Sequence, residues 1–339
     1  MSPVRCSIPG STRRWPRSSR GAARSCSSTR AARRPAEPPV VLIAVTGATG
    51  FVGRHITTML ARRGHAVRAL VRRPTQARAL ESLGVELVPG GLADVAALTA
   101  LTRGANAVVH LVGIIVEASG VTFHAVHVEG TRRVLEAAGR AGVERFVHMS
   151  AVGARDEPGA TPYHRTKWHA EQLVRTSGLS HALFRPSIIS GPESAPIRTL
   201  ARLHRWSPVV PVFGDGHYPT QPVWVEDVAL AFALAVEQPT LSGAFQLGGP
   251  QVLTYEEFLL AIGRATRHPR PLVHVPLALA RAATAAFGLL GAAAPLTSDQ
   301  LQMLVEGSAT PANAIESVFG IRPLPFDEGL RRYLAPVRE

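Results

Sequence analysis

One stretch of the sequence indicates the fold most clearly. It reads Val40-Val41-Leu42-Ile43-Ala44-Val45-Thr46-Gly47-Ala48-Thr49-Gly50-Phe51-Val52-Gly53. Six apolar residues in a row are typical of a parallel strand that is buried on both faces. Three glycines with the spacing G-x-x-G-x-x-G come next, and an apolar-patterned segment follows them. The stretch therefore predicts a strand, a glycine-rich turn and a helix, which together form a dinucleotide-binding unit.

Each glycine has a physical role at this predicted turn. Gly47 permits the sharp exit from the strand, Gly50 lets the backbone approach a pyrophosphate, and Gly53 lets the helix pack tightly on the sheet. The helix points its unpaired N–H groups at the anionic phosphates. We expect the cofactor-binding loop to comprise Gly47, Thr49, Gly50, Phe51, Val52 and Gly53.

Composition and charge restrict the classes of function. The 339 residues are 46% hydrophobic, which fits one large or two associated globular domains. The net charge is +13, but residues 1–39 hold nine arginines and one acid, so the remainder carries only +5. That remainder does not interleave aromatic and basic residues, and we expect no nucleic-acid partner. Both cysteines, Cys6 and Cys26, lie in residues 1–39, which leaves no thiol for a disulfide, a zinc site or catalysis elsewhere, and we expect no metal.

Residues 1–39 are rich in Arg, Ser and Pro and have no apolar period, so we expect a disordered basic tail. Two interpretations of the tail compete. It resembles a mitochondrial transit peptide, which would place the protein in the mitochondrial matrix. A GC-rich genome would also favour arginine over lysine and produce a disordered extension, or translated sequence upstream of the true start. We favour the second interpretation and expect a cytoplasmic protein.

From Val40 onward, short apolar runs alternate with amphipathic segments, which predicts repeated βα units and a doubly wound parallel sheet. Further strands are expected at Ala66–Val71, Val85–Pro89, Ala107–Leu111, Arg145–Met149 and His181–Arg185. Helices are expected at Phe51–Arg63, Thr75–Ser82, Val95–Leu101, Phe123–Ala141 and Tyr163–Ser177. Glycines that suit helix C-terminal turns follow four of these helices: Gly64, Gly84, Gly142 and Gly178.

After Pro186 this rhythm ends and proline-rich connections replace it. We expect a dinucleotide-binding domain over 40–190, to which 223–247 returns as a helix at Val225–Glu237 and a strand at Ala244–Leu247. The rest, 191–222 and 248–339, is expected to form a smaller, mostly helical substrate or lid domain. Within it, 278–294 is apolar but interrupted by Arg281, and too short for a membrane span. We interpret 278–294 as a buried or interface helix, or as a peripheral contact with a membrane or redox complex.

Tyr163-His164-Arg165-Thr166-Lys167 places a phenol and an ammonium four residues apart at the start of a predicted helix. Residues i and i+4 share a helix face, so the two groups point into the same space. An ammonium and a bound cationic nicotinamide both favour the phenolate, which makes Tyr163 a candidate acid and base. Lys167 is the only lysine in the chain. Ser150 ends the fifth strand, where a hydroxyl can hydrogen-bond the reacting substrate oxygen.

These motifs together resemble the short-chain dehydrogenase/reductase superfamily in its extended or atypical branch. The resemblance covers about residues 40–335 and includes T-G-A-T-G-F-V-G, then His110-Leu111-Val112-Gly113, Ser150 and Y-x-x-x-K. Arg185-Pro186-Ser187 and Val223-Trp224-Val225-Glu226-Asp227 resemble later motifs of that branch. The likeness is greatest to bacterial relatives of the nucleotide-binding accessory subunit of mitochondrial complex I. It implies that Tyr163 is the acid and base, that Lys167 supports it and binds the nicotinamide ribose, and that Ser150 orients the substrate. It also implies cofactor contacts at Leu111, Pro186 and Ser187.

Two positions depart from the wider family. Gly91 stands where an adenine-contacting aspartate is common, so a contact there must come from backbone or water. His127 occupies a helix position that asparagine often fills. Such a histidine can replace the asparagine in the proton relay, or it can simply satisfy a backbone carbonyl.

Cofactor preference follows from the end of the second strand. A site selective for NAD usually has an acidic residue there for the ribose diol. This chain has Val71-Arg72-Arg73 and no acid nearby. Two guanidiniums suit a 2′-phosphate, so we expect NADP(H) to be preferred, with NAD(H) possible.

The sequence supports two hypotheses about function. The first is an oxidoreductase that transfers hydride at a carbonyl or alcohol, or transiently oxidises its substrate as an epimerase or dehydratase does, with Tyr163 as acid and base. The second is a non-catalytic NADPH-binding structural, sensor or assembly protein of a membrane redox complex. The Ser150, Tyr163 and Lys167 set favours the first, and the nearest resemblance favours the second. The small-molecule substrate has no readable motif.

Overall fold

The structure, a computed structural model, describes residues 40–118, 120–288 and 296–334. The predicted basic tail, 1–39, lies outside the described residues. So do the last six residues of the segment 278–294.

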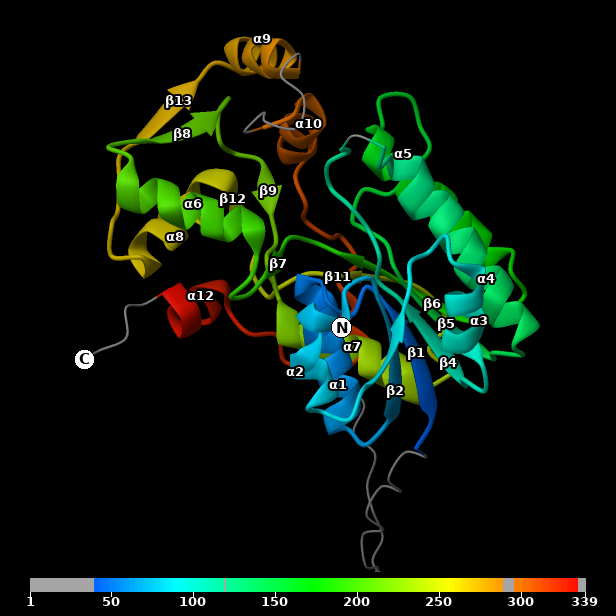
Figure 1. Cartoon of the computed structure of the whole chain (residues 1–339). Coiled ribbons are helices and arrows are strands. Elements are labelled where there is room, and N and C mark those ends of the chain that lie inside the picture. Colours follow the sequence, from blue (N-terminus) through cyan, green and yellow to red (C-terminus); the bar gives the residue numbers. More distant parts are fainter. Residues whose placement is uncertain (1–39, 119, 289–295, 335–339) are drawn as a thin grey trace, which may run out of the picture. The chain divides into compact units, whose positions relative to one another are not determined.

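A seven-stranded parallel sheet forms the centre of the fold (Figure 1). Its strand order is β11-β6-β5-β4-β1-β2-β3, in which the order reverses between β1 and β4. The strands are β1 (Leu42–Thr46), β2 (Ala66–Val71), β3 (Glu86–Pro89), β4 (Ala107–His110), β5 (Arg145–Met149), β6 (Ser180–Pro186) and β11 (Gly243–Leu247). The predicted doubly wound α/β fold is confirmed, and its reversal point is where such sheets bind ligands.

Helices cover both faces of this sheet. One face buries apolar side chains against α1 (Phe51–Arg62), α2 (Arg78–Glu81), α7 (Val225–Glu237) and α11 (Ala314–Ser317). The other face packs on α3 (Val95–Thr102), α4 (Gly130–Arg140) and α5 (Pro162–Arg175). Because the sheet is covered on both faces, its strands read as continuous apolar runs rather than as alternating ones.

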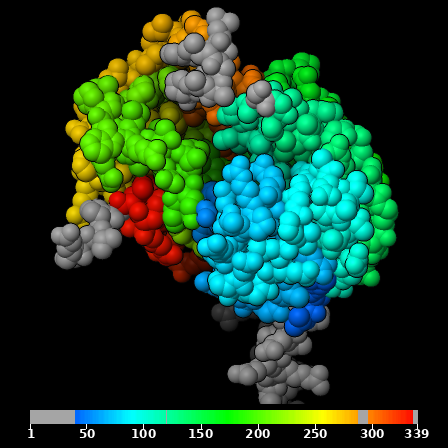
Figure 2. Space-filling view, viewed as in Figure 1, coloured from blue at the N-terminus to red at the C-terminus, as the bar shows by residue number. Residues whose placement is uncertain are grey.

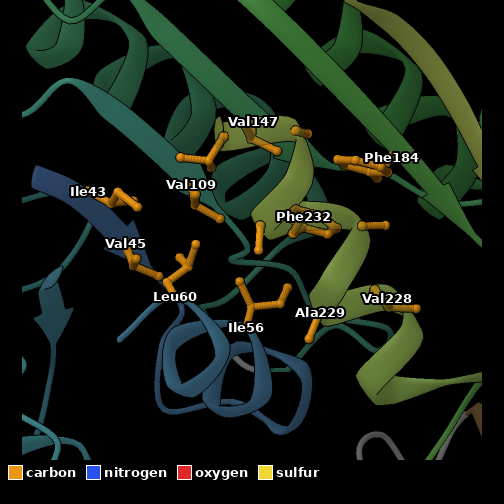
Figure 3. Close-up of a cluster of buried hydrophobic side chains, with 14 of the residues drawn as sticks. Ile43, Val45, Ile56, Leu60, Val109, Val147, Phe184, Val228, Ala229 and Phe232 are labelled. Carbon is orange, nitrogen blue, oxygen red and sulfur yellow. The ribbon is translucent and has the colours of Figure 1, made fainter. Parts of the chain in front are cut away.

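The core on the α1 and α7 face shows how the opening apolar run is used (Figure 3). Ile43 and Val45 point into this core, whereas Ala44 belongs to the core on the opposite face. Phe184 of β6 stacks on Phe232 of α7 with ring centroids 4.3 Å apart. Full burial of each such side chain stabilises the fold by about 1.5–3 kcal/mol. The core therefore fixes α1, and with it the glycine turn, against the sheet.

The four predicted helix-ending glycines have the expected backbone conformation, but two predicted helices differ in their interiors. Each of these glycines has a positive φ, between 69° and 88°. The expected helix Phe123–Ala141 is instead a π-helical turn, His124–Glu129, that continues as α4. The expected helix Thr75–Ser82 is divided into a 3-10 turn, Pro74–Gln76, and the short α2. Apolar spacing alone does not distinguish these variants from one α-helix.

A separate hydrophobic cluster defines the smaller lobe, by which we mean α6 (Ala195–Trp206), β8 (Val210–Phe213), α8 (Tyr255–Ala265) and α12 (Phe326–Leu334). Figure 2 shows its green, yellow and red surface beside the blue and cyan surface of the sheet region. Short strands accompany these elements and were not predicted: β7 (Ile189–Ser190), β9 (Pro219–Thr220), β10 (Val223–Trp224), β12 (Leu253–Thr254) and β13 (Leu272–Val275). The domain boundaries themselves stay a prediction.

Two helices complete the described chain, α9 (Leu277–Gly288) and α10 (Ser298–Glu306). Helix α9 begins the segment in which we predicted an apolar helix. Among the described helices, none combines the length and the apolar character that a membrane crossing requires.

Candidate functional site

A cavity of about 360 Å³ opens where β1, β4, β5 and β6 end. These four ends meet because the strands are parallel neighbours around the reversal of strand order. Lining residues come from the glycine loop (Gly47, Gly50, Phe51, Val52, Gly53), from the segment after β4 (Leu111, Gly113, Ile114, Ile115) and from the ends of β5 and β6 (Met149, Ser150, Ala151, Pro186, Ser187, Ile189). Tyr163 and Lys167 of α5 complete the wall.

The glycine loop has the geometry that its sequence predicts. Gly47 has φ +80°, and a Cβ there would lie 3.0 Å from the backbone of Leu111. A Cβ on Gly53 would overlap the carbonyl oxygen of Gly47. Gly50 is exposed at the N-cap of α1, and no side chain caps the helix there. The first-turn N–H groups of α1 are therefore available to an anion in the cavity.

Tyr163 and Lys167 are brought together by the start of α5. Thr161 caps this helix by accepting a hydrogen bond from His164 N, and Pro162 occupies its first position. Burial raises the pKa of Tyr163 to about 12. Burial also lowers the pKa of Lys167 to about 8, although the Glu171 carboxylate acts in the other direction.

Lys167 is held by the end of β5 and faces a glycine. Its Nζ donates to the carbonyl oxygen of Met149 at 3.1 Å. A Cβ on Gly113 would lie 3.0 Å from this Nζ, so the absence of a side chain at Gly113 leaves the ammonium room. An ammonium has three protons, and two remain for other acceptors in the cavity.

Ser150 faces the same cavity from the end of β5. The residue is 3% exposed, and its Oγ has no hydrogen-bond partner in the described part of the chain. A buried hydroxyl without a partner is uncommon and marks a place where a ligand atom or water completes the bonding. Its backbone N–H donates to Phe184 O at 2.7 Å, which fixes the residue's position beside β6.

The hydrogen bonds of His127 show which groups its ring contacts. Its Nε2 accepts the N–H of Ile114 at 3.1 Å, which places the ring proton on Nδ1. Nδ1 then donates to Thr166 Oγ1 at 3.0 Å. Burial and the charge of Lys167 lower the pKa of His127 to about 3, so the ring is neutral. The ring also meets Tyr163 edge to face, with centroids 5.6 Å apart. His127 therefore satisfies a backbone N–H rather than the backbone carbonyl of the second alternative, and its ring packs against that of Tyr163.

The remaining predicted cofactor residues divide into two groups. Leu111 and Pro186 line the cavity, and so does Ser187, but the Ser187 hydroxyl donates to Ser308 O at 2.6 Å. Thr49, in contrast, does not line the cavity. The two arginines that follow β2, Arg72 and Arg73, do not line the cavity either.

Arg72 and Arg73 are exposed immediately after β2. The register pairs Thr46 with Leu70, so the chain after β2 lies beside the start of the glycine loop. Among the described residues, neither guanidinium forms a hydrogen bond or ion pair. Both side chains are thus free to meet an anionic group that extends from the loop.

Sequence reasoning missed two parts of the site. Ile114 and Ile115 prolong the apolar run of β4, so nothing distinguished them from strand residues. The second part is a contact between α10 and the loop before α5, in which Glu306 Oε1 lies 2.9 Å from Arg155 Nη2 and Glu306 Oε2 lies 3.5 Å from His164 Nδ1. No sequence signal connects residues so far apart. No group of three or more acidic, histidine or cysteine side chains suited to a metal occurs in the described ranges.

The residues present fit a dinucleotide. The uncapped N-terminus of α1 offers N–H groups to a pyrophosphate, and the close contact of Gly47 with Leu111 leaves no space for a side chain between them. At the far end of the cavity, the buried Ser150 Oγ lacks a partner among the described residues. The cavity thus joins an anion-binding end to a polar end, as a dinucleotide with a reactive ring requires.

The fold and this loop define a dinucleotide-binding protein of the Rossmann type. A family model described as NAD(P)H-binding matches residues 47–206. Among solved structures, the UDP-glucose 4-epimerase of Thermus thermophilus in complex with NAD superposes with a TM-score of 0.67 and 24% identity. The match covers 86% of this chain and 97% of that one.

Relatives of this chain include enzymes and a subunit of a redox complex. Ceramide reductase of Caulobacter vibrioides is 36% identical over 59% of this chain, which spans 62% of that protein's length. Sterol demethylase protein B of Methylococcus capsulatus is 30% identical over 68% of this chain and 76% of that protein. The rat (Rattus norvegicus) mitochondrial NADH dehydrogenase [ubiquinone] 1 alpha subcomplex subunit 9 is 29% identical over 86% of this chain and 80% of that protein. The chain belongs to the NAD(P)-binding Rossmann family.

Proposed function

We propose that the protein is an NADP(H)-dependent oxidoreductase that reduces a carbonyl group, with Tyr163 as the proton donor. The observation that carries the proposal is the convergence of Ser150, Tyr163 and Lys167 on the cavity that begins at the glycine loop. By its name, the relative ceramide reductase performs a reduction, which supports this direction of the reaction.

The protonation states support reduction. With a pKa of about 12, Tyr163 carries its proton at neutral pH and can give it to a carbonyl oxygen. Lys167, with a pKa of about 8, is mostly an ammonium at pH 7 and stabilises the negative charge that tyrosine acquires. Ser150 Oγ, which has no partner among the described residues, is positioned to donate a hydrogen bond to the same carbonyl oxygen.

The dinucleotide, when bound, supplies the hydride that the carbonyl carbon accepts. The substrate oxygen gains the proton that Tyr163 loses, so the product is the alcohol and the tyrosine is reprotonated from solvent. The α1 N-terminus would hold the pyrophosphate. Arg72 and Arg73 would hold a 2′-phosphate, which supports NADP(H) over NAD(H).

Transfer of deuterium tests this function. The protein is incubated with NADPH deuterated at C4 and with a panel of ketones, aldehydes and nucleotide sugars. Deuterium at the carbinol carbon of a product is the expected result. Tight NADPH binding without transfer to any compound would contradict the proposal.

A second candidate is a non-catalytic NADPH-binding protein that associates with a redox complex. Its support is the 29% identity with the complex I subunit over 86% of this chain. In that case cofactor binding stabilises the protein, and Ser150, Tyr163 and Lys167 have no chemical role. The absence of deuterium transfer together with cofactor-dependent assembly would favour it.

A further inference from the structure

The rim of the cavity beside Tyr163 is unusually apolar. Ile114 and Ile115 line the cavity, and three aliphatic residues of the following loop are exposed: Ile115 (51%), Val116 (36%) and Val121 (41%). Single exposed aliphatic residues are ordinary on a protein surface, but several on one short loop at a site opening indicate a binding surface.

The described residues of this loop, 114–118 and 120–121, are held in place by hydrogen bonds and packing. Ala118 and Val121 exchange two backbone hydrogen bonds, of 3.1 and 2.8 Å. The Glu117 carboxylate accepts the N–H of Phe123 at 2.6 Å. The Phe123 ring in turn meets the Tyr163 ring edge to face, with centroids 5.8 Å apart. The aliphatic rim is therefore fixed relative to the proton donor.

Charge at the opening disfavours an anionic substrate. Lys167 is the only cation among the described residues that line the cavity, and Met149 O already accepts one of its hydrogen bonds. Arg155, in the loop before α5, is paired with Glu306. The pKa of Asp299 in α10 is raised, first by burial and then by the negative charge of Glu117. A phosphate group beside this rim would meet carboxylates rather than a free guanidinium.

We infer that the substrate is a neutral aliphatic ketone or the corresponding alcohol, with its hydrocarbon chain lying along Ile115 and Val116 toward α10. This inference rests on the proposed oxidoreductase function and names its substrate class. The carbonyl reaches Ser150 and Tyr163, while the chain covers the exposed aliphatic side chains that the loop presents. We expect the same surface to disfavour nucleotide sugars, because they carry a diphosphate.

The test uses a homologous series of methyl ketones, from 2-butanone to 2-dodecanone, with NADPH and the full-length protein. Each methylene buried on the rim should raise kcat/KM by about two- to fourfold until the rim is covered. UDP-glucose should neither be consumed nor compete. A fluorescently labelled long-chain ketone, displaced by 2-dodecanone, reports binding without turnover.

Ile115→Asp places a charge on the rim, and Val273→Asp is its control. Val273 is 45% exposed on β13 and does not line the cavity. Ile115→Asp should reduce the ratio of kcat/KM for 2-dodecanone to that for 2-butanone by at least about tenfold, whereas Val273→Asp should leave this ratio unchanged.

Each outcome separates the inference from the function on which it rests. Turnover that is independent of chain length, or that requires a nucleotide sugar, would overturn the substrate class and leave the oxidoreductase in place. Displaceable binding of the labelled ketone without hydride transfer to any ketone would overturn the oxidoreductase and keep the aliphatic ligand. No hydride transfer to any compound, nucleotide sugars included, together with no binding of any ketone, would overturn both.

Discussion

Burial moves the pKa values of Tyr163 and Lys167 in opposite directions, which fits the roles proposed for them. Tyr163 stays protonated because its pKa rises to about 12, and Lys167 becomes easier to deprotonate because its pKa falls to about 8. The neutral ring of His127 contributes no charge to this pair and serves as support. The site thus holds one proton donor and one ammonium near neutral pH.

The pKa of Lys167 predicts how activity depends on pH. The ammonium is present below pH 8 and is lost as the pH rises through about 8, so kcat/KM should fall above that value. Tyr163 does not titrate in this range. Lys167→Met should abolish the step in a profile measured from about pH 6 to 10. A profile that retains the step in Lys167→Met would assign it to another group.

The pH dependence of folding stability that arises from Lys167 should run opposite to that of activity: stability should rise with pH where activity falls. Because the pKa of Lys167 in the folded protein lies below its ordinary value of 10.5, folding disfavours the charged form. The resulting loss of stability develops as the pH falls from 10.5 to about 8 and is complete below about 8. The gain in thermal stability of Lys167→Met should therefore be larger near pH ~7 than near pH ~10.

Arg72 and Arg73 should decide between the two dinucleotides. Titration should show tighter binding of NADPH than of NADH, and the Arg72→Ala/Arg73→Ala variant should close the gap, because charge-assisted hydrogen bonds to a phosphate contribute about 1.5–3 kcal/mol. Arg78→Ala, an exposed arginine on α2, is the matched control. Equal affinities of the unmodified protein for the two cofactors would refute the assignment.

At the scale of elements, the strand, glycine turn and helix of β1 and α1 form one unit whose packing and binding depend on the same glycine. Gly53→Ala would overlap the Gly47 carbonyl and displace the loop. We expect a loss of about 1–3 kcal/mol in unfolding free energy and weaker cofactor binding. Gly139→Ala is the control, since a Cβ there meets nothing within 4 Å in α4 and should be neutral or stabilising. A Gly53→Ala protein with unchanged stability and affinity would contradict this packing.

The bounds of the individual strands and helices show how much of the fold the sequence could predict. The strands β2 and β5 match their expected ranges because each apolar run ends at residues that cannot continue it, and α7 matches Val225–Glu237 for the same reason. The π-helical turn that carries His127 could not be predicted, since its apolar spacing differs little from that of an α-helix. Two-residue strands such as β9 and β12 depend on their partners and leave no periodic pattern.

At the scale of the whole molecule, contacts between distant segments complete the site. Ser187, just after β6, donates to Ser308, and Glu306 of α10 joins Arg155 in the loop before α5. Gln302 Nε2 also donates to Gly159 O at 2.6 Å. Each contact pairs residues that are far apart in the sequence. A motif could therefore indicate the proposed catalytic set Ser150, Tyr163 and Lys167, whereas no motif indicates the segment that lies beside it.

The same contacts place α10 next to the loop before α5 and to the first turn of α5, which carries Tyr163 (Figure 1). The cavity lies at the ends of the sheet strands, and α10 contacts the loop before α5 without contributing a residue to the cavity wall. Apart from Ser187 and the Val223–Asp227 motif, the residues after Pro186 carry no readable motif. They supply surface and contacts, whereas the residues proposed to carry the chemistry, Ser150, Tyr163 and Lys167, belong to the βα units.

Tyr163→Phe tests the central claim, proton transfer by Tyr163, most directly. The substitution keeps the ring and its contacts with Phe123 and His127 but removes the hydroxyl. The rate of hydride transfer in a single turnover should fall by about two to four orders of magnitude, while NADPH affinity barely changes. Tyr255→Phe, at a buried tyrosine of the smaller lobe, is the control and should keep the full rate. An unchanged rate in Tyr163→Phe, or a protein in which Gly50→Val abolishes function while Tyr163→Phe has no effect, would reject catalysis by this tyrosine.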